Sequence, residues 1–144
     1  MAKGYSKQEG IDYTETFSPI ARLESIRLLI SFAVNNGITL YQMDVKSGFL
    51  NGYIDEEVYV HQPPGFENSK YPEYVFKLKK SLYGLKKAPR AWYERLSNFL
   101  LEKEFTRGKV DTTLFCKTFK NDILVCQIYV DDIIFGYTKP SLGR

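Results

Sequence analysis

Two adjacent aspartates, Asp131 and Asp132, are the residues whose type and spacing most invite chemistry. They lie between two apolar, β-branched runs, which predicts a strand, a turn and a second strand. A third aspartate, Asp44, stands near the end of another apolar run. Carboxylates that converge attract Mg²⁺, which accepts one or two of them together with phosphate oxygens. Aspartate pairs are also common in hairpin turns, so these residues alone leave both interpretations open.

Side-chain alternation along the strands predicts where these carboxylates lie. In the run that ends at Asp131, this residue shares a face with Gln127. In the run 38–45, Asp44 shares the more polar face with Gln42. We therefore expect both acids on the solvent-facing side of a half-buried sheet, each near the end of its strand. If these strands are neighbours, Asp44 and Asp131 meet in one cleft.

Two helices and several strands are predicted around these acids. The first helix begins at Leu23 and stops at Asn36-Gly37, and the second has Pro89 in its first turn. The pattern predicts one α+β domain with a mainly antiparallel sheet and two principal helices packed on one side. The predicted strands are 38–45, 57–62, 74–78, 113–117, 123–130 and 133–137. The predicted buried stripes are Leu23, Ile26, Ile30 and Ala33 in the first helix, and Trp92, Leu96, Phe99 and Leu100 in the second.

The composition is that of an ordinary globular protein, with 144 residues, of which 44% are hydrophobic and 26% charged. No apolar run is long enough to cross a bilayer, so we expect no membrane partner. Cys116 and Cys126 lie in strand-like runs, which predicts reduced, buried thiols. A cytoplasmic location is the corresponding expectation.

Positive charge is concentrated in the segment 77–95, where Glu94 is the one acidic residue. Aromatic side chains are interleaved with the charges, and this combination suits a polyanionic partner such as nucleic acid. A solvated, lysine-rich face is the alternative interpretation of the same segment. The basic residues are Lys77, Lys79, Lys80, Lys86, Lys87, Arg90 and Arg95.

The pair of aspartates belongs to an ordered series of motifs that covers almost the whole chain. The series resembles the reverse transcriptases of copia-type LTR retrotransposons, and it is far more specific than the four residues Tyr-Val-Asp-Asp alone. The matching blocks are 15–27 (ETFSPIARLESIR), 42–52 (QMDVKSGFLNG), 57–66 (EVYVHQPPGF), 79–93 (KKSLYGLKKAPRAWY) and 128–135 (IYVDDIIF).

The resemblance implies an RNA-directed DNA polymerase, a nucleotidyltransferase that extends a primer 3′-hydroxyl with dNTPs. By the same resemblance, Asp44, Asp131 and Asp132 are the catalytic, metal-binding aspartates of the palm. The backbone carbonyl of Val45 is a further expected ligand. Two Mg²⁺ ions are the implied cofactors, with Mn²⁺ as a substitute.

Further site residues follow from the resemblance. Phe49 matches the steric gate that excludes a ribose 2′-hydroxyl, although without the family it would be taken as a core aromatic. The family usually has alanine at the position of Gly48, and Trp92 is expected in the core. The implied nucleotide-binding residues are Gly48, Phe49, Tyr83 and Gly84, and the implied nucleic-acid-binding residues are Lys86, Lys87, Arg90, Tyr129 and Val130.

The resemblance covers the fingers and palm of such a polymerase as a single partial domain over 1–144, without the thumb and RNase H domain. The expected partners are an RNA or DNA template–primer, dNTPs and the remainder of a larger Pol polyprotein. The alternative function is a truncated, inactive retrotransposon relic that at most binds nucleic acid. The sequence leaves open whether this chain alone is an active enzyme.

Overall fold

The computed structural model describes residues 17–138. Glu15 and Thr16 of the first motif block, and both ends of the predicted domain, lie outside the described residues. The elements, in chain order, are α1 (Leu23–Asn35), β1 (Thr39–Asp44), the 3₁₀ helix η1 (Gly48–Asn51), β2 (Tyr59–His61), β3 (Val75–Lys77), α2 (Ala88–Glu102), β4 (Thr106–Arg107), β5 (Leu114–Phe119), β6 (Asp122–Tyr129) and β7 (Asp132–Tyr137). These bounds confirm the predicted helices and place every predicted strand to within a few residues.

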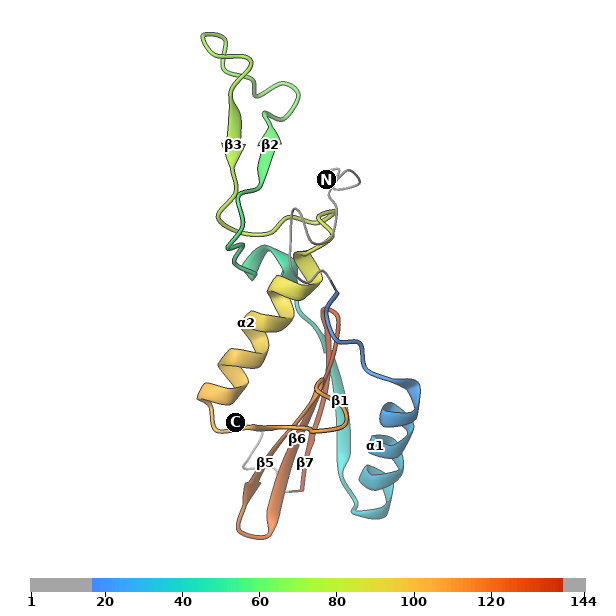
Figure 1. Cartoon of the computed structure of the whole chain (residues 1–144). Coiled ribbons are helices and arrows are strands. Elements are labelled where there is room, and N and C mark those ends of the chain that lie inside the picture. Colours follow the sequence, from blue (N-terminus) through green and yellow to red (C-terminus); the bar gives the residue numbers. More distant parts are fainter. Residues whose placement is uncertain (1–16, 139–144) are drawn as a thin grey trace.

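Two antiparallel sheets organise the chain. The larger has five strands in the order β1-β7-β6-β5-β4, and β2 pairs with β3 in a separate two-stranded sheet. Figure 1 shows the β2–β3 hairpin extending away from the larger sheet and both α-helices. The predicted α+β class with a mainly antiparallel sheet is therefore confirmed. Among residues 17–138, neither α-helix is long and apolar enough to cross a bilayer.

One face of the larger sheet is covered by α2 and forms the main core. Tyr93 and Leu100 of the helix lie in one cluster with Phe115, Ile128 and Ile133 of the strands. The strand residues point the same way because the register pairs Ile128 with Ile133. Cys126 belongs to the same cluster, and burial raises the pKa of its thiol to about 12. Both cysteines are free, and Cys126 is buried as expected, whereas Cys116 is only partly buried.

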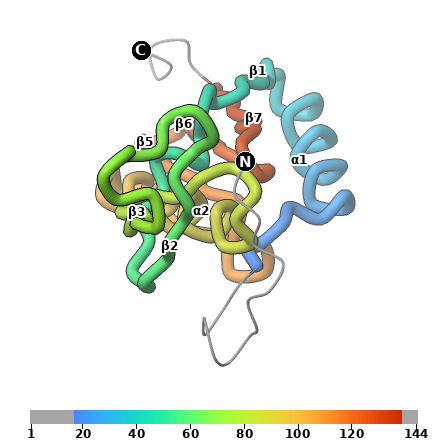
Figure 2. Tube along the Cα trace, turned by 90° about the horizontal axis from the view of Figure 1, so that it is seen from above, coloured from blue at the N-terminus to red at the C-terminus, as the bar shows by residue number. Residues whose placement is uncertain are grey.

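The first helix, α1, packs on the other face of this sheet. Its Leu29 and Ala33 are buried, and its Ser25 hydrogen-bonds the carboxylate of Asp111. That carboxylate also accepts a hydrogen bond from Gln127 Nε2 at 3.3 Å, on the strand face opposite to Ile128. Both views show α1 and α2 apart with β7 between them (Figures 1 and 2). In this detail the packing differs from the expectation that both helices lie on one side.

The inward stripe of α1 therefore differs from the predicted stripe. Leu23 and Ile30 are 56% and 48% exposed, whereas Leu29 and Ala33 are buried. In α2, Phe99 is likewise exposed although the pattern placed it in the core. Apolar residues surround both helices on more than one side, so periodicity alone does not decide which stripe meets the sheet.

The face beneath α1 is also less open than expected. Gln127 is 0% exposed, where alternation along the strand predicted a solvent-facing position. The pKa of Asp111 would be raised by burial, but hydrogen bonds from Thr113, Ser25 and Gln127 lower it overall. A polar network between α1 and the sheet therefore replaces solvent on this face.

Candidate active site

The larger sheet brings Asp44 and Asp132 together at one end. β1 pairs with β7, and their register places Asp44, the last residue of β1, opposite Asp132, the first residue of β7. Residues opposite each other in an antiparallel pair point to the same face, with Cβ atoms about 4.5–5.5 Å apart. Gln42 Nε2 donates to Asp132 Oδ1 at 3.2 Å. Two carboxylates thus lie side by side on the face that also carries Gln42.

Asp131 lies in the turn between β6 and β7. A backbone hydrogen bond connects it to the residue that follows β1. The N–H of Val45 donates to the carbonyl oxygen of Asp131 at 3.1 Å. The carbonyl of Val45, the expected metal ligand, accepts a hydrogen bond from Gly48 N at 3.0 Å. A carbonyl oxygen has two lone pairs, so this bond is compatible with a further ligand.

The position of Asp131 corrects the geometry expected from strand alternation. That alternation continued the strand through Asp131 and had this residue meet Asp44 in one cleft if their two strands were neighbours. In the structure β6 ends at Tyr129, and β7 is the strand next to β1. Asp44 is therefore opposite Asp132, while Asp131 approaches from the turn. The reason is topological, because strand order depends on contacts between distant segments.

Val130 holds this turn in a conformation that is rare for its residue type. Tyr129 pairs with Asp132, which leaves a two-residue turn, and Val130 has φ = 57°. Two-residue hairpins commonly need a positive φ at this position, where glycine has no steric cost. A β-branched residue there is strained, typically by about 1–3 kcal/mol, and such strain concentrates at functional sites.

We expect Val130→Gly to stabilise the fold while impairing the site. Relief of the positive φ should raise the free energy of unfolding by about 1 kcal/mol. The same change removes a side chain next to Asp131 and loosens the turn, so primer extension should fall. Urea denaturation and a primer-extension assay measure the two effects. Val125→Gly, in the middle of β6, is the control and should destabilise. A destabilised Val130→Gly variant would contradict the strain argument.

The expected nucleotide-binding residues converge on η1 and the segment before α2. The rings of Phe49 and Tyr83 lie 4.8 Å apart between centroids. Ser81, which the sequence did not single out, donates from its hydroxyl to the Phe49 carbonyl and from its N–H to the Gly52 carbonyl at 2.9 Å. Ser81 is 0% exposed, so this link is part of the interior. Gly84, with φ = 95°, continues the same loop.

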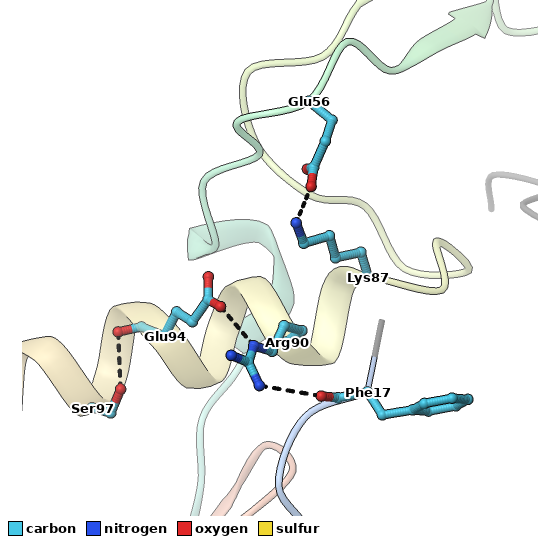
Figure 3. Close-up of polar contacts among 6 residues, drawn as sticks. All are labelled: Phe17, Glu56, Lys87, Arg90, Glu94 and Ser97. Atoms are coloured by element: carbon cyan, nitrogen blue, oxygen red, sulfur yellow. Dashed lines mark hydrogen bonds and ion pairs between the residues drawn. The ribbon is translucent and has the colours of Figure 1, made fainter. Parts of the chain in front are cut away.

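The expected nucleic-acid contacts fall into two groups. Lys87 forms an ion pair with Glu56, and Arg90 donates to Glu94 at 2.6 Å and to the carbonyl of Phe17 at 3.4 Å (Figure 3). These two cations hold the start of α2 against neighbouring segments. Lys86 and Tyr129 are exposed instead. The signal for Lys87 and Arg90 was positive charge. Glu94 lies four residues after Arg90 on the same helix, whereas only the fold brings Glu56 to Lys87.

The donor atoms at this end of the sheet suit a hard divalent cation. Across residues 17–138, no three carboxylate, histidine or cysteine side chains lie close enough to hold a metal ion as they stand. Mg²⁺ needs only one or two carboxylates when substrate phosphates supply further oxygens. Asp44 and Asp132 provide such a pair, with Asp131 in the adjoining turn. The residues thus fit the ion chemically, and the full ligand set remains a prediction.

The antiparallel sheet places aspartates at a hairpin, and Phe49, whose backbone is bound by the buried Ser81, lies in the adjoining 3₁₀ helix. This arrangement fits the palm of a nucleic-acid polymerase. Comparison with known families agrees, because the family model described as reverse transcriptase (RNA-dependent DNA polymerase) matches residues 1–140. The chain belongs to this family.

The relatives specify the subgroup. The chain is 45% identical to the retrovirus-related Pol polyprotein from transposon RE1 of Arabidopsis thaliana, over 99% of this chain and 10% of that protein. It is 39% identical to the corresponding polyprotein from transposon TNT 1-94 of Nicotiana tabacum, over 100% of this chain and 11% of that protein. The resemblance to copia-type elements is thus confirmed, and the chain spans about a tenth of the length of these relatives. No solved structure matches significantly.

Proposed function

We propose that this chain is the fingers–palm portion of an RNA-directed DNA polymerase that joins dNTPs to a primer 3′-hydroxyl by two-metal nucleotidyl transfer. The observation that carries the proposal is the pairing of Asp44 with Asp132, with Asp131 in the connecting turn. Family membership supports the polymerase class. The named relatives are Pol polyproteins, so we propose that the chain works within a larger Pol polyprotein.

The side chains at the hairpin and on η1 have distinct parts in this mechanism. When bound, two Mg²⁺ ions supply activation of the 3′-hydroxyl and neutralise charge on the leaving pyrophosphate. Asp44 and Asp131 would hold the ions at the end of the sheet, and Asp132, which lies opposite Asp44, would supply further negative charge. Gly48 lies beside them and donates its backbone N–H to the Val45 carbonyl, which fixes the position of that expected ligand. The protein's contribution is mainly positioning and charge neutralisation, as in other phosphoryl transfers.

Phe49 is the proposed sugar-selecting residue. Its ring lies against Tyr83, and its backbone carbonyl is held by the buried Ser81. A ring that packs against a neighbouring ring, on a backbone that is itself anchored, cannot move aside easily for an extra hydroxyl. The contact therefore supports a gate that excludes the ribose 2′-hydroxyl and favours dNTPs.

Primer extension on an RNA template, with Mg²⁺ and dNTPs, tests the proposed function. The chain should be compared with a longer chain that continues into the adjacent Pol sequence, because duplex binding can need more protein than these residues. Asp44→Asn is the active-site control and should abolish extension in whichever chain is active. Extension that survives Asp44→Asn, or its absence from the longer chain, contradicts the proposal.

We expect weak, salt-sensitive nucleic-acid binding by the exposed part of the 77–95 segment. Affinity for a labelled primer–template should fall steeply as salt rises, because neutralised phosphates release counterions. Lys86→Ala should weaken binding and reduce the salt slope by about 1. Lys117→Ala is the control, because that lysine donates to Glu104 and to the carbonyl of Lys103. Fluorescence anisotropy at several salt concentrations measures the slope, and a salt-independent Kd would disprove the electrostatic contact.

A further inference from the structure

Trp92 is a buried residue whose polar atom lacks a partner. It is the single tryptophan of the chain and is 7% exposed in α2. Within residues 17–138, its Nε1–H is buried and makes no hydrogen bond. A buried donor without a partner costs about 1–3 kcal/mol, and native structures rarely keep one without a reason. Burial agrees with the expected core position, but core packing alone does not explain the orphaned N–H.

The indole and Asp131 face the same small space beside Gly48. A Cβ placed on Gly48 would lie 3.4 Å from Trp92 Nε1 and 3.5 Å from Asp131 Cβ. Because residue 48 is glycine, no side chain of its own enters this space. The orphaned donor and a carboxylate-bearing residue thus both lie close to one point. A carboxylate accepts hydrogen bonds in two directions at each oxygen, so it can bind a cation and an N–H together.

We propose that Trp92 is a positioning residue, whose Nε1–H donates a hydrogen bond to the Asp131 carboxylate when this carboxylate binds a divalent cation. The inference rests on the proposed function, because it assigns a metal to Asp131. An N–H bonded to a carboxylate fixes its rotation and leaves the other lone pairs directed at the metal. The hydrogen-bond acceptor that Trp92 Nε1–H lacks in this structure is then the Asp131 carboxylate of the metal-bound state. Trp92 thereby links the buried face of α2 to the site.

The single indole makes the bond directly observable. In the ¹⁵N-labelled chain, the one indole N–H signal should move downfield as MgCl₂ is added in the presence of a dideoxy-terminated primer–template and the next dNTP. The shift should saturate with metal. It should disappear in Asp131→Asn, which keeps the side chain's size but removes the charged acceptor.

A second measurement separates positioning from packing. Trp92→Phe keeps an aromatic ring in the core and removes the N–H, so it should weaken Mg²⁺ binding about 10- to 100-fold, as loss of a ligand's supporting hydrogen bond typically does. Leu100→Ala, in the same helix but in the core cluster between α2 and the sheet, should lower stability and leave Mg²⁺ affinity unchanged. Competition against Mn²⁺, followed by electron paramagnetic resonance, measures affinity without polymerase activity.

The outcomes distinguish this inference from the proposed function. Mg²⁺ binding that requires Asp131, with an unmoved indole signal or unchanged affinity in Trp92→Phe, overturns the role of Trp92 and leaves the polymerase proposal intact. A complex that binds no Mg²⁺ overturns both. If Trp92→Phe does not fold, the indole titration of the unmodified chain still decides the question.

Discussion

Asp131→Asn is expected to lower primer extension on the order of 10²–10³-fold, the loss typical when a group that stabilises transition-state charge is removed. Asp132→Asn should lower it far less. Asp131 stands in the turn next to Gly48, where the nucleotide's phosphates would lie. Asp132 is held in the strand register and accepts a hydrogen bond from Gln42, which gives it a structural partner. Asparagine keeps the shape in both cases, so the difference reports on charge.

Single-turnover extension by the active chain measures this ranking. Asp122→Asn is a matched control, because Asp122 begins the same strand, β6, at the end remote from the turn. Circular dichroism melts of all three variants show whether folding is retained. Equal losses for Asp131→Asn and Asp132→Asn would contradict the assignment of the principal ligand, and an active Asp131→Asn variant would contradict the metal site itself.

Gly52→Ala is expected to lower the free energy of unfolding by about 1–3 kcal/mol, the usual cost of overpacking an interior. A Cβ at this position would lie 2.8 Å from the backbone carbon and Cβ of Ala91, and 2.8 Å from Trp92 N. These atoms belong to the rigid part of α2, so the helix and η1 must separate. Because η1 carries Phe49, discrimination between dNTPs and rNTPs should weaken in the same variant.

Urea denaturation measures the stability change, and competition between a dNTP and the matching rNTP measures the selectivity. Gly48→Ala, at the other end of η1, provides the comparison. Its added Cβ would meet side-chain atoms at 3.3–3.5 Å, and these can shift by a few tenths of an ångström. Gly48→Ala should therefore change stability much less. A Gly52→Ala variant with an unchanged urea midpoint would show that η1 and α2 are not packed as closely as described.

Local patterns in the sequence predicted the elements of the fold well. The helix signal at Pro89 was confirmed by α2, whose first turn contains this proline. Alternating apolar residues predicted β5, β6 and β7, because side chains in a strand point to opposite faces by turns. The same patterns were right for Ala33 of α1, which is buried, but misjudged the rest of its stripe, because Leu29 packs inward while Leu23 and Ile30 are exposed. Which stripe is buried depends on the surface that the helix meets.

The sequence by itself determined the chemistry available to this protein: three aspartates, a gate-like phenylalanine and a basic segment, in an order that resembles one polymerase family. Tertiary structure decided how these residues act on one another. It placed Asp132 rather than Asp131 opposite Asp44, paired Lys87 with Glu56, and set the orphaned N–H of Trp92 beside the Asp131 turn. The physical reason is that strand order, register and helix packing arise from contacts between segments far apart in the chain, which local residue patterns do not encode.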